Sequence, residues 1–151
     1  MGLITAVTDY KAFEDVIAPL WAAYNAKEYH ADQSEQWAFV VNDGEVVSGG
    51  IGGYMQREWM YVQHLIVAET SRGKGLGRTL LSAIIDAARQ ADLHILVGGI
   101  DAANGASIAL HEQLGFVHAG TIRHAAFKFD RWLDLAFYQL MLSTPAHPVD
   151  G

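Results

Sequence analysis

The sequence contains no cysteine, only three prolines, and fewer basic than acidic residues. Without cysteine the chain cannot form a disulfide, use a thiol as a nucleophile or bind zinc through thiolates. Ten Lys and Arg stand against 17 Asp and Glu, which gives a net charge of −7, and the basic residues are scattered along the chain. Nucleic-acid binding needs a concentrated basic surface, so the composition argues against a nucleic-acid partner.

Long apolar runs are also missing. No stretch approaches the roughly 20 apolar residues that a membrane-spanning helix needs, and residues 1–5 lack the features of a signal peptide. We therefore expect a soluble, cytoplasmic protein without a membrane partner. Of the 151 residues 51% are apolar, which suffices for the core of one domain. We predict a single domain over residues 1–142 and a disordered tail over residues 143–151.

Glycine, in contrast, is abundant, and one glycine-rich stretch, Arg72-Gly73-Lys74-Gly75-Leu76-Gly77, separates two apolar segments. The run Leu65-Ile66-Val67 precedes it, and apolar residues at helical spacing follow from Leu76. This order predicts a strand, a loop and a helix. Glycines let a ligand approach the backbone closely, and the amides at a helix N-terminus bind anions such as pyrophosphate. We therefore expect an anionic cofactor at this loop.

The spacing of this loop excludes two common phosphate-binding motifs. A Walker loop ends in Gly-Lys-Ser or Gly-Lys-Thr, and the chain contains no Lys-Ser or Lys-Thr pair. A dinucleotide fingerprint needs Gly-x-Gly-x-x-Gly, whereas Gly73, Gly75 and Gly77 are followed by Arg78. The pattern that remains is Arg-x-x-Gly-x-Gly between a strand and a helix.

The N-terminal half is predicted to hold a helical segment followed by an antiparallel meander. A β-prone run at 3–8 precedes a helical pattern over 9–29, in which Asp9 is a candidate N-cap and Pro19 should separate two helices. Asn42-Asp43-Gly44 predicts a hairpin, and four glycines between 49 and 53 indicate a bulge or a close backbone approach. The predicted strands are 37–42, 45–54 and 59–67.

In the C-terminal half, a helix from Leu76 to about Ala91 leads to a strand over 93–97 that should end at Gly98 and Gly99. A strand, a crossover helix and a second strand predict a parallel pair. Asn104 is a candidate N-cap of the next helix, which should end near Gly115. Two more strands are predicted at 116–118 and 134–142.

Two motifs together resemble the GCN5-related N-acetyltransferase (GNAT) superfamily. The loop 72–77 is similar to its acetyl-CoA loop, and 104–116, Asn-Gly-Ala-Ser-Ile-Ala-Leu-His-Glu-Gln-Leu-Gly-Phe, is similar to its Asn-x-x-Ser-x-x-Leu-(Tyr/His)-Glu-x-x-Gly-Phe segment. Residues 99–101 and 127–134 resemble the phosphinothricin and methionine sulfoximine acetyltransferase branch. The resemblance implies an α/β (α+β) fold, with a mixed central sheet of about six to seven strands and helices on both faces.

The resemblance also implies a function. It indicates an N-acetyltransferase that transfers the acetyl group of acetyl-CoA directly to a primary amine of a small molecule, such as an amino acid analogue of the phosphinothricin or methionine sulfoximine type. The alternative is a non-catalytic acyl-CoA-binding sensor or interaction module of the same fold. Branch members suggest a homodimer. We expect no metal site, because His64, His111 and His124 lack the spacing of metal ligands.

The cofactor contacts implied by the family come from the strand, the loop and the second helical motif. Asn104, Ser107 and His111 are three and four residues apart and should share one helix face toward the pantetheine arm. The alternative makes Asn104 only an N-cap and His111 a solvated helix residue. The implied cofactor-binding residues are Leu65, Ile66, Val67, Arg72, Gly73, Lys74, Gly75, Leu76, Gly77, Arg78, Asn104, Ser107 and His111.

The general base is the point at which the sequence departs from the family. Many members carry glutamate ten residues before the first loop position, and this count back from Arg72 gives Val62. Because strand side chains alternate, we expect His64 to share the face of Val62 and to act as base, or to be a strand histidine without a catalytic role. Glu58 is an alternative base, and Gln63 should point to the opposite face.

The remaining site residues follow from the resemblance. His111 occupies the position of the family's tyrosine, so it is expected to be the acid that protonates the leaving thiolate. Trp21 and Tyr24 belong to the segment that forms the wall of the acceptor pocket in the family. Arg123 and Trp132 lie in a basic and aromatic region where an arginine can bind a substrate carboxylate or contact a second subunit. The alternative for Trp21 and Tyr24 is packing, and the alternative for Lys128 and Arg131 in the basic region is a solvated loop.

Overall fold

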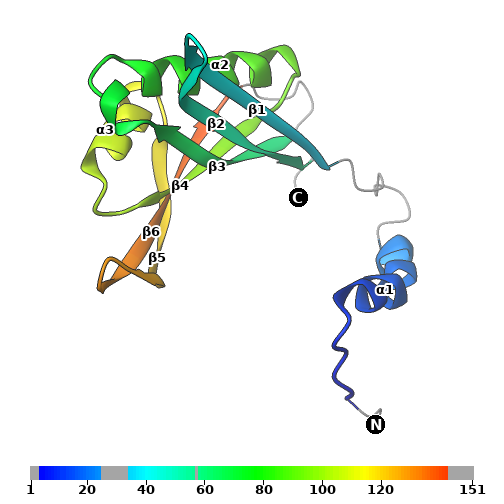
Figure 1. Cartoon of the computed structure of the whole chain (residues 1–151). Coiled ribbons are helices and arrows are strands. Elements are labelled where there is room, and N and C mark those ends of the chain that lie inside the picture. The colour runs from blue at the N-terminus through cyan, green and yellow to red at the C-terminus, as the bar shows by residue number, and fades with distance from the viewer. Residues whose placement is uncertain (1–3, 25–33, 57, 143–151) are drawn as a thin grey trace. The chain divides into compact units, whose positions relative to one another are not determined.

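The computed structural model describes residues 4–24, 34–56 and 58–142. The chain divides into two units, 1–32 and 33–151, and each is described by itself. The first unit contains helix α1 (Tyr10–Tyr24), and the second contains a six-stranded sheet with helices α2 and α3 (Figure 1). The predicted tail, 143–151, lies outside the described residues.

Helix α1 begins as predicted, because a carboxylate oxygen of Asp9 accepts hydrogen bonds from the amides of Lys11 and Ala12 at 3.0 and 3.3 Å. The predicted break at Pro19 is wrong, since one helix runs through it. Proline removes only the bond to the carbonyl of Asp15, and the neighbouring residues keep theirs. Residues 4–9 form no strand, so the predicted strand at 3–8 is wrong over them. No strand pairing involves these residues, and a strand without a partner leaves its backbone groups unbonded.

The second unit is built on one mixed sheet with the strand order β1-β2-β3-β4-β6-β5. The first three strands form the predicted antiparallel meander, and β3 and β4 form the predicted parallel pair around the crossover helix α2. The six strands and the crossover confirm the mixed α/β architecture. The bounds are β1 (Ser34–Asp43), β2 (Val46–Gln56), β3 (Trp59–Val67), a 3-10 turn (Glu69–Ser71), α2 (Leu76–Gln90), β4 (Ile95–Asp101), α3 (Gly105–Gln113), β5 (Val117–Lys128) and β6 (Arg131–Met141).

The last two strands are longer than predicted. Residues 123–132, predicted to precede the last strand, form the turn end of a β5–β6 hairpin that extends beyond the rest of the sheet (Figure 1). Its turn residues Phe129 and Asp130 have φ values of 55° and 56°. In hairpin turns, residues with such positive φ values are usually Asn-Gly. The sequence also gives little sign of strand β5, because β5 is exposed along almost its whole length. An exposed strand does not need alternating apolar and polar residues.

Helices α2 and α3 pack on one face of this sheet. Helix α2 buries one apolar stripe, and Leu96 and Ile100 of β4 face the same core. A Leu→Ala change at a site such as Leu81, which is fully buried, should cost about 2–5 kcal/mol through lost contacts and a residual cavity. The buried residues of α2 are Leu80, Leu81, Ile84, Ile85 and Ala88.

Strands β3 and β4 pair only along their first halves. Their register runs from Trp59 opposite Ile95 to Val62 opposite Gly98, and no later pair joins them within the described residues. Strand β3 nevertheless continues to Val67 and β4 to Asp101. The two strands therefore separate into a fork, and each has backbone groups there that the other strand does not bond.

A bulge in β3 lies at the mouth of this fork. Gly52 pairs with His64 and Gly53 with Val62, so Gln63 is an extra residue without a partner on β2. A Cβ at Gly53 would overlap the carbonyl oxygen of Tyr61. The glycine-rich part of β2 thus makes the close backbone approach that its sequence indicated, and the bulge lies opposite it, on β3.

Candidate functional site

Two neighbouring cavities are both lined by residues of β3 and α3. The first, the loop cavity, has a volume of about 240 Å³ and lies at the N-terminus of α2. The second, the fork cavity, has a volume of about 160 Å³ and lies where β3 and β4 separate. The loop cavity is lined by Val67, Ser71, Arg72, Gly73, Gly75, Leu76, Gly77, Arg78 and Leu110. The fork cavity is lined by Val62, Gln63, Leu65, Gly98, Gly99, Ile100, Asp101, Asn104, Ser107 and His111.

The glycines of the loop set up the start of α2. Gly73 and Gly75 have φ values of 76° and 78°, in the left-handed region where a side chain is strained. The first bond of α2 runs from the amide of Thr79 to the carbonyl of Gly75 at 3.1 Å. The amides of residues 76–78 precede it and have no partner within the helix. They point a partial positive charge into the loop cavity, which suits a phosphate.

Two arginines add positive charge at this cavity. Arg72 donates from Nε to the carbonyl of Val67 at 3.3 Å, and Arg78 donates to the side chain of Gln113 at 3.3 Å. Both residues line the loop cavity, whereas Lys74 is exposed and is not among its lining residues. The loop therefore combines helix amides with guanidinium groups, the usual composition of a diphosphate site.

Helix α3 carries the polar side of the fork cavity. The side chain of Asn104 accepts a hydrogen bond from the amide of Ser107 at 3.1 Å, so Asn104 is the N-cap that the sequence predicted. Asn104, Ser107 and His111 all line the fork cavity, as expected from their spacing. The two readings of Asn104, helix cap and site residue, are therefore compatible.

His111 is buried at the inner end of this cavity, with 3% of its surface exposed. Its Nδ1 lies 2.7 Å from the carbonyl oxygen of Ser107, and its ring packs edge-on against Phe116 at 5.0 Å between centroids. The reading of His111 as a solvated helix residue is therefore wrong. Burial lowers the pKa of His111 below its usual value, and the hydrogen bond to Ser107 opposes that shift without cancelling it.

The fork cavity contains one residue that the sequence placed elsewhere. Gln63 lines it together with Val62, although simple alternation had assigned Gln63 to the opposite face. The bulge at Gln63 interrupts the alternation, so the inward positions pass from Val62 to Leu65, which also packs against the core. The expectation that His64 shares the face of Val62 is wrong for the same reason. His64 is exposed and is not among the described residues lining the fork cavity.

Other predicted residues fall near or outside these cavities. Leu65 lines the fork cavity and Val67 the loop cavity, whereas the side chain of Ile66 is 68% exposed and lines neither. Glu58 is exposed in the turn just before β3, where its carbonyl accepts a hydrogen bond from the amide of His94 at 2.6 Å. Glu58 is thus separated along β3 from the fork.

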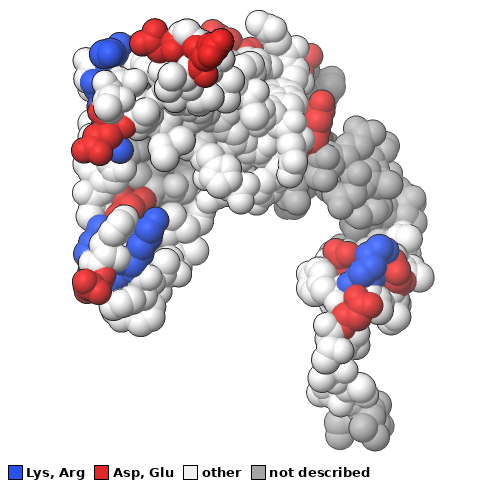
Figure 2. Space-filling view, in the orientation of Figure 1, with Lys and Arg blue, Asp and Glu red and all other residues white. Residues whose placement is uncertain are grey.

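Arg123 and Trp132, predicted to bind the acceptor, lie on the β5–β6 hairpin and line neither cavity. The Trp132 ring stacks on His124 at 5.8 Å, and the amide of His124 donates to Asp134 at 2.9 Å. Arg123 is exposed. Figure 2 shows basic and acidic side chains gathered together at this hairpin.

One ion pair connects the hairpin with the fork. Arg131 of β6 contacts Asp101 at the end of β4 at 2.8 Å. The amide of Ala103 and the side chain of Arg131 donate hydrogen bonds to this carboxylate. These hydrogen bonds lower the pKa of Asp101 below its usual value. The aspartate is therefore ionised near neutral pH.

Trp21 and Tyr24, the other predicted acceptor residues, belong to helix α1 in the separate N-terminal unit. Their rings contact each other edge-on with centroids 6.0 Å apart. Their role in acceptor binding stays a prediction.

Sequence reasoning missed the glycines of β4. Gly98 and Gly99 do not end the strand, which runs through them to Asp101. A Cβ at Gly99 would lie 2.6 Å from the hydroxyl oxygen of Tyr61, and one at Gly98 would lie 3.1 Å from Nε2 of His111. Both glycines therefore make room for a side chain at the fork. Adjacent glycines after an apolar run could have suggested such an approach, but the same pattern is typical of a strand end.

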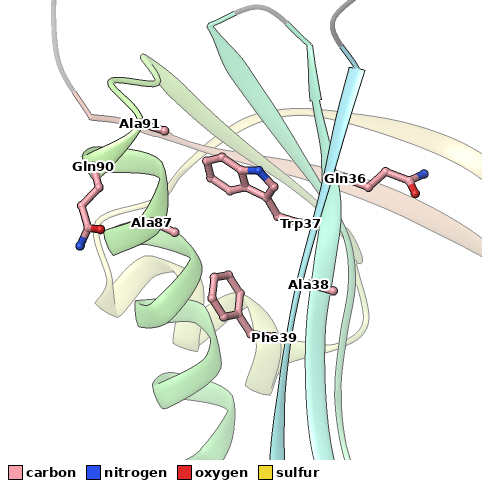
Figure 3. Close-up of a pocket in the computed structure, with 7 residues that line it drawn as sticks. All are labelled: Gln36, Trp37, Ala38, Phe39, Ala87, Gln90 and Ala91. Carbon is pink, nitrogen blue, oxygen red and sulfur yellow. The ribbon is translucent and has the colours of Figure 1, made fainter.

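A larger groove of about 490 Å³ lies away from the fork, between β1 and α2. Figure 3 shows the rings of Trp37 and Phe39 directed toward Ala87 and Ala91 of α2. None of its lining residues has a titratable side chain, so this groove offers no acid or base for catalysis. The described residues also contain no group of three His, Asp or Glu side chains placed to hold a metal ion. No described helix is both long and apolar enough to cross a membrane.

The model of the Acetyltransferase (GNAT) family matches residues 5–116, which is more than half of the chain. The chain belongs to the GNAT acetyltransferase family. Among solved structures, yncA of Salmonella typhimurium, determined with its cofactor acetyl-CoA, has a TM-score of 0.68 and 33% identity, and the match covers 97% of this chain and 80% of that one. An N-acetyltransferase of Staphylococcus aureus has a TM-score of 0.67 and 34% identity, over 92% of this chain and 84% of that one.

Curated relatives carry names from the amino acid acetyltransferases. An L-methionine sulfoximine/L-methionine sulfone acetyltransferase of Salmonella typhimurium is 48% identical over 88 residues, which are 58% of this chain and 52% of the relative. The L-amino acid N-acyltransferase MnaT of Escherichia coli is 47% identical over 88 residues, which are 58% of this chain and 51% of the relative. The chain thus spans about half the length of the curated relatives it matches.

Proposed function

We propose that this GNAT chain transfers the acetyl group of acetyl-CoA to the primary amine of a small molecule of the amino acid type. The observation that carries the proposal is the arrangement of the two cavities along the same elements. Val67 and Leu110 line the loop cavity, and Leu65 and His111 line the fork cavity. Strand β3 and helix α3 therefore lead from a diphosphate site to a site with a titratable side chain.

The residues of the chain fit acetyl-CoA along this path. The amides of 76–78, with Arg72 and Arg78, would hold the pyrophosphate. Beyond Val62 and Gly98 the two strands no longer bond each other, so their backbone groups can bond the amides of an extended pantetheine arm. Asn104 and Ser107 would provide further polar contacts, and the acetyl group would reach the fork beside His111.

The amino acid type of the acceptor is supported by the relatives. Their names specify L-amino acids, methionine sulfoximine and methionine sulfone. A carboxylate on such an acceptor needs a cation, and Arg123 and Arg131 on the β5–β6 hairpin are candidates. We expect amino acid analogues to be better acceptors than amines without a carboxylate.

A non-catalytic acyl-CoA-binding module is the second candidate. It is favoured by Val62, which is 5% exposed and stands where many family members have the glutamate base. Free-thiol release from acetyl-CoA separates the two functions, measured with L-amino acids, methionine sulfoximine, phosphinothricin, polyamines and peptides. The enzyme releases thiol when a suitable amine is present, whereas the module binds acetyl-CoA and releases none with any of these amines.

The cytoplasmic location and the homodimer stay predictions. The β5–β6 hairpin offers a surface for a second subunit, because several of its large apolar side chains are exposed: Ile122, Phe127, Phe129 and Trp132. Light scattering of the purified chain measures its mass and tests the homodimer. A Phe127→Glu change should shift a homodimer toward monomer, and a monomeric wild-type chain would contradict the prediction.

A further inference from the structure

We propose that His111 is a proton relay, whose Nε2 accepts the proton that the attacking amine loses and passes it to the sulfur of CoA. This inference rests on the proposed acetyltransferase function and assigns a role within it. It differs from the expectation that His111 is only an acid, because an acid must carry its proton before the reaction begins.

The tautomer of His111 is the first argument. A backbone carbonyl oxygen accepts hydrogen bonds and cannot donate them, so Nδ1, at 2.7 Å from the carbonyl of Ser107, must carry a hydrogen. In a neutral imidazole the other nitrogen, Nε2, then has no hydrogen and presents a lone pair. Burial favours this neutral form, since it lowers the pKa of His111. The resting chain therefore presents an acceptor at Nε2.

The position of Nε2 is the second argument. Nε2 lies next to Gly98, because a Cβ on that residue would lie 3.1 Å from Nε2 and 3.4 Å from Cδ2. Gly98 is the last β4 residue that pairs with β3, opposite Val62. Nε2 therefore lies beside the residue where the fork begins, and His111 lines the fork cavity. The edge-on contact with Phe116 and the bond to Ser107 hold the ring in this position.

The other side chains of the fork cavity provide the third argument. Apart from His111, the one titratable group among its lining residues is Asp101. Asp101 is bonded by Arg131 and by the amide of Ala103, which lower its pKa and make it a weak proton acceptor. Gln63 and Asn104 are amides that do not titrate. Val62 has no proton acceptor, so within this cavity the proton transfer falls to His111.

In the proposed reaction, Nε2 of His111 acts twice, first as a proton acceptor and then as a proton donor. The ammonium group of the acceptor first loses one proton to solvent, which gives a neutral amine. The amine nitrogen attacks the thioester carbon, the π electrons of the carbonyl move to its oxygen, and the new C–N bond leaves the nitrogen positively charged. Nε2 of His111 takes a proton from this nitrogen. The electron pair on oxygen then re-forms the C=O bond, the C–S bond breaks with its electron pair on sulfur, and Nε2 gives the proton to sulfur. The products are the amide and the thiol of CoA, and His111 is neutral again.

The tautomer can be tested without any reaction. Long-range ¹H–¹⁵N NMR correlations of the full chain at neutral pH distinguish the two nitrogens of each histidine, and the His111 signals are those that disappear in His111→Phe. We expect hydrogen on Nδ1 and none on Nε2. Hydrogen on Nε2 in the neutral state would overturn the proposal, whatever the activity of the chain.

Kinetics of His111→Phe and His111→Gln test the relay itself. The phenyl ring preserves the packing against Phe116, and the amide preserves polarity without a proton that titrates. Both variants should lose about 10²-fold or more in kcat, as expected for general acid–base catalysis, with unchanged CoA affinity by titration calorimetry. His118→Gln is the matched control, since His118 is exposed on β5 and contacts Thr121 and Tyr138 outside the cavities.

A different division of effects would contradict the relay. If His111→Phe weakened CoA binding and kept kcat, Nε2 would serve only to hold the pantetheine arm. Wild-type kcat should also fall as the pH drops below 6.5, where His111 gains a proton and Nε2 can no longer accept one. The charged neighbour at the cavity is Asp101 with its partner Arg131, so Asp101→Asn should keep this dependence of kcat on pH.

If the wild-type chain released no thiol with any amine, the proposed function would fail. The NMR result would still decide the tautomer of His111.

Discussion

Gly98 and His111 fit together so closely that a single methyl group would disturb them, because a Cβ on Gly98 would lie 3.1 Å from Nε2 of His111. Such a separation is tighter than ordinary van der Waals contact, and the buried ring has little room to move. Gly98→Ala should therefore turn the ring away from the fork and lower kcat/KM about tenfold or more, with a stability cost of about 1–3 kcal/mol.

Gly105→Ala is the control for this prediction. Gly105 begins α3, and a Cβ there would meet no atom within 4 Å. The activity and Tm of the Gly105→Ala variant should match or exceed those of the wild type, because alanine favours a helix. Thermal unfolding and steady-state kinetics measured on both variants give the comparison. Wild-type activity in Gly98→Ala would show that the position of the His111 ring does not matter.

Gly75 tests the conformation of the glycine loop separately from its contacts. Its φ is +78° and a Cβ would meet nothing within 4 Å, so Gly75→Ala introduces backbone strain without a clash inside the protein. We expect a cost of about 1–2 kcal/mol and weaker binding of CoA, measured by calorimetric titration. Gly44→Ala is the matched variant, since Gly44 has a φ of +62° in equally open space on the β1–β2 turn. It should lose similar stability and keep its CoA affinity, and equal affinity in both variants would contradict the phosphate site.

Asn104 caps α3, and substitution can separate this role from its predicted second role in binding CoA. Asn104→Ala removes the bond to the amide of Ser107 and should cost about 0.5–2 kcal/mol of stability together with CoA affinity. Asn104→Asp keeps an oxygen for the cap and should retain the wild-type Tm, but it loses the side-chain amide hydrogens of a residue that lines the fork cavity. If Asn104→Asp bound CoA as tightly as the wild type, Asn104 would be a helix cap only.

The stability of the chain should depend on pH through His111. Burial lowers the pKa of His111 in the folded chain below the usual 6.5, so between the two values the unfolded chain binds more protons than the folded one. The contribution is complete above pH 6.5 and is lost as the pH falls through the folded pKa. Urea unfolding of the wild type and of His111→Phe across this range measures it. The wild type should lose more stability than the variant on acidification, and parallel losses would contradict a buried neutral His111.

The sequence predicted the local parts of the site and missed the parts that depend on distant strands. The glycine loop and the cap at Asn104 follow from residues close in the chain, and both were found at the predicted positions. The bulge at Gln63 depends on how β2 pairs with β3. It reverses the faces expected for Gln63 and His64, and no periodicity within β3 alone could reveal it.

The glycines of β4 show the same limit. Glycine after an apolar run commonly ends a strand, and Gly98 and Gly99 were interpreted in that way. Their actual reason is the approach of His111 and Tyr61 from other elements, which only the folded structure brings together. The close approach of His111 to Gly98 likewise depends on the folded structure, whereas the place of His111 on the helix face with Asn104 and Ser107 followed from spacing.

The most direct test of the proposed function is amine-dependent release of free thiol from acetyl-CoA by the purified chain, with mass detection of the acetylated amine. With methionine sulfoximine or another L-amino acid analogue, we predict one thiol released for each amide formed, and a rate that falls about 10²-fold or more in His111→Phe. Tight binding of acetyl-CoA without thiol release for any amine would contradict the account and identify the chain as a binding module.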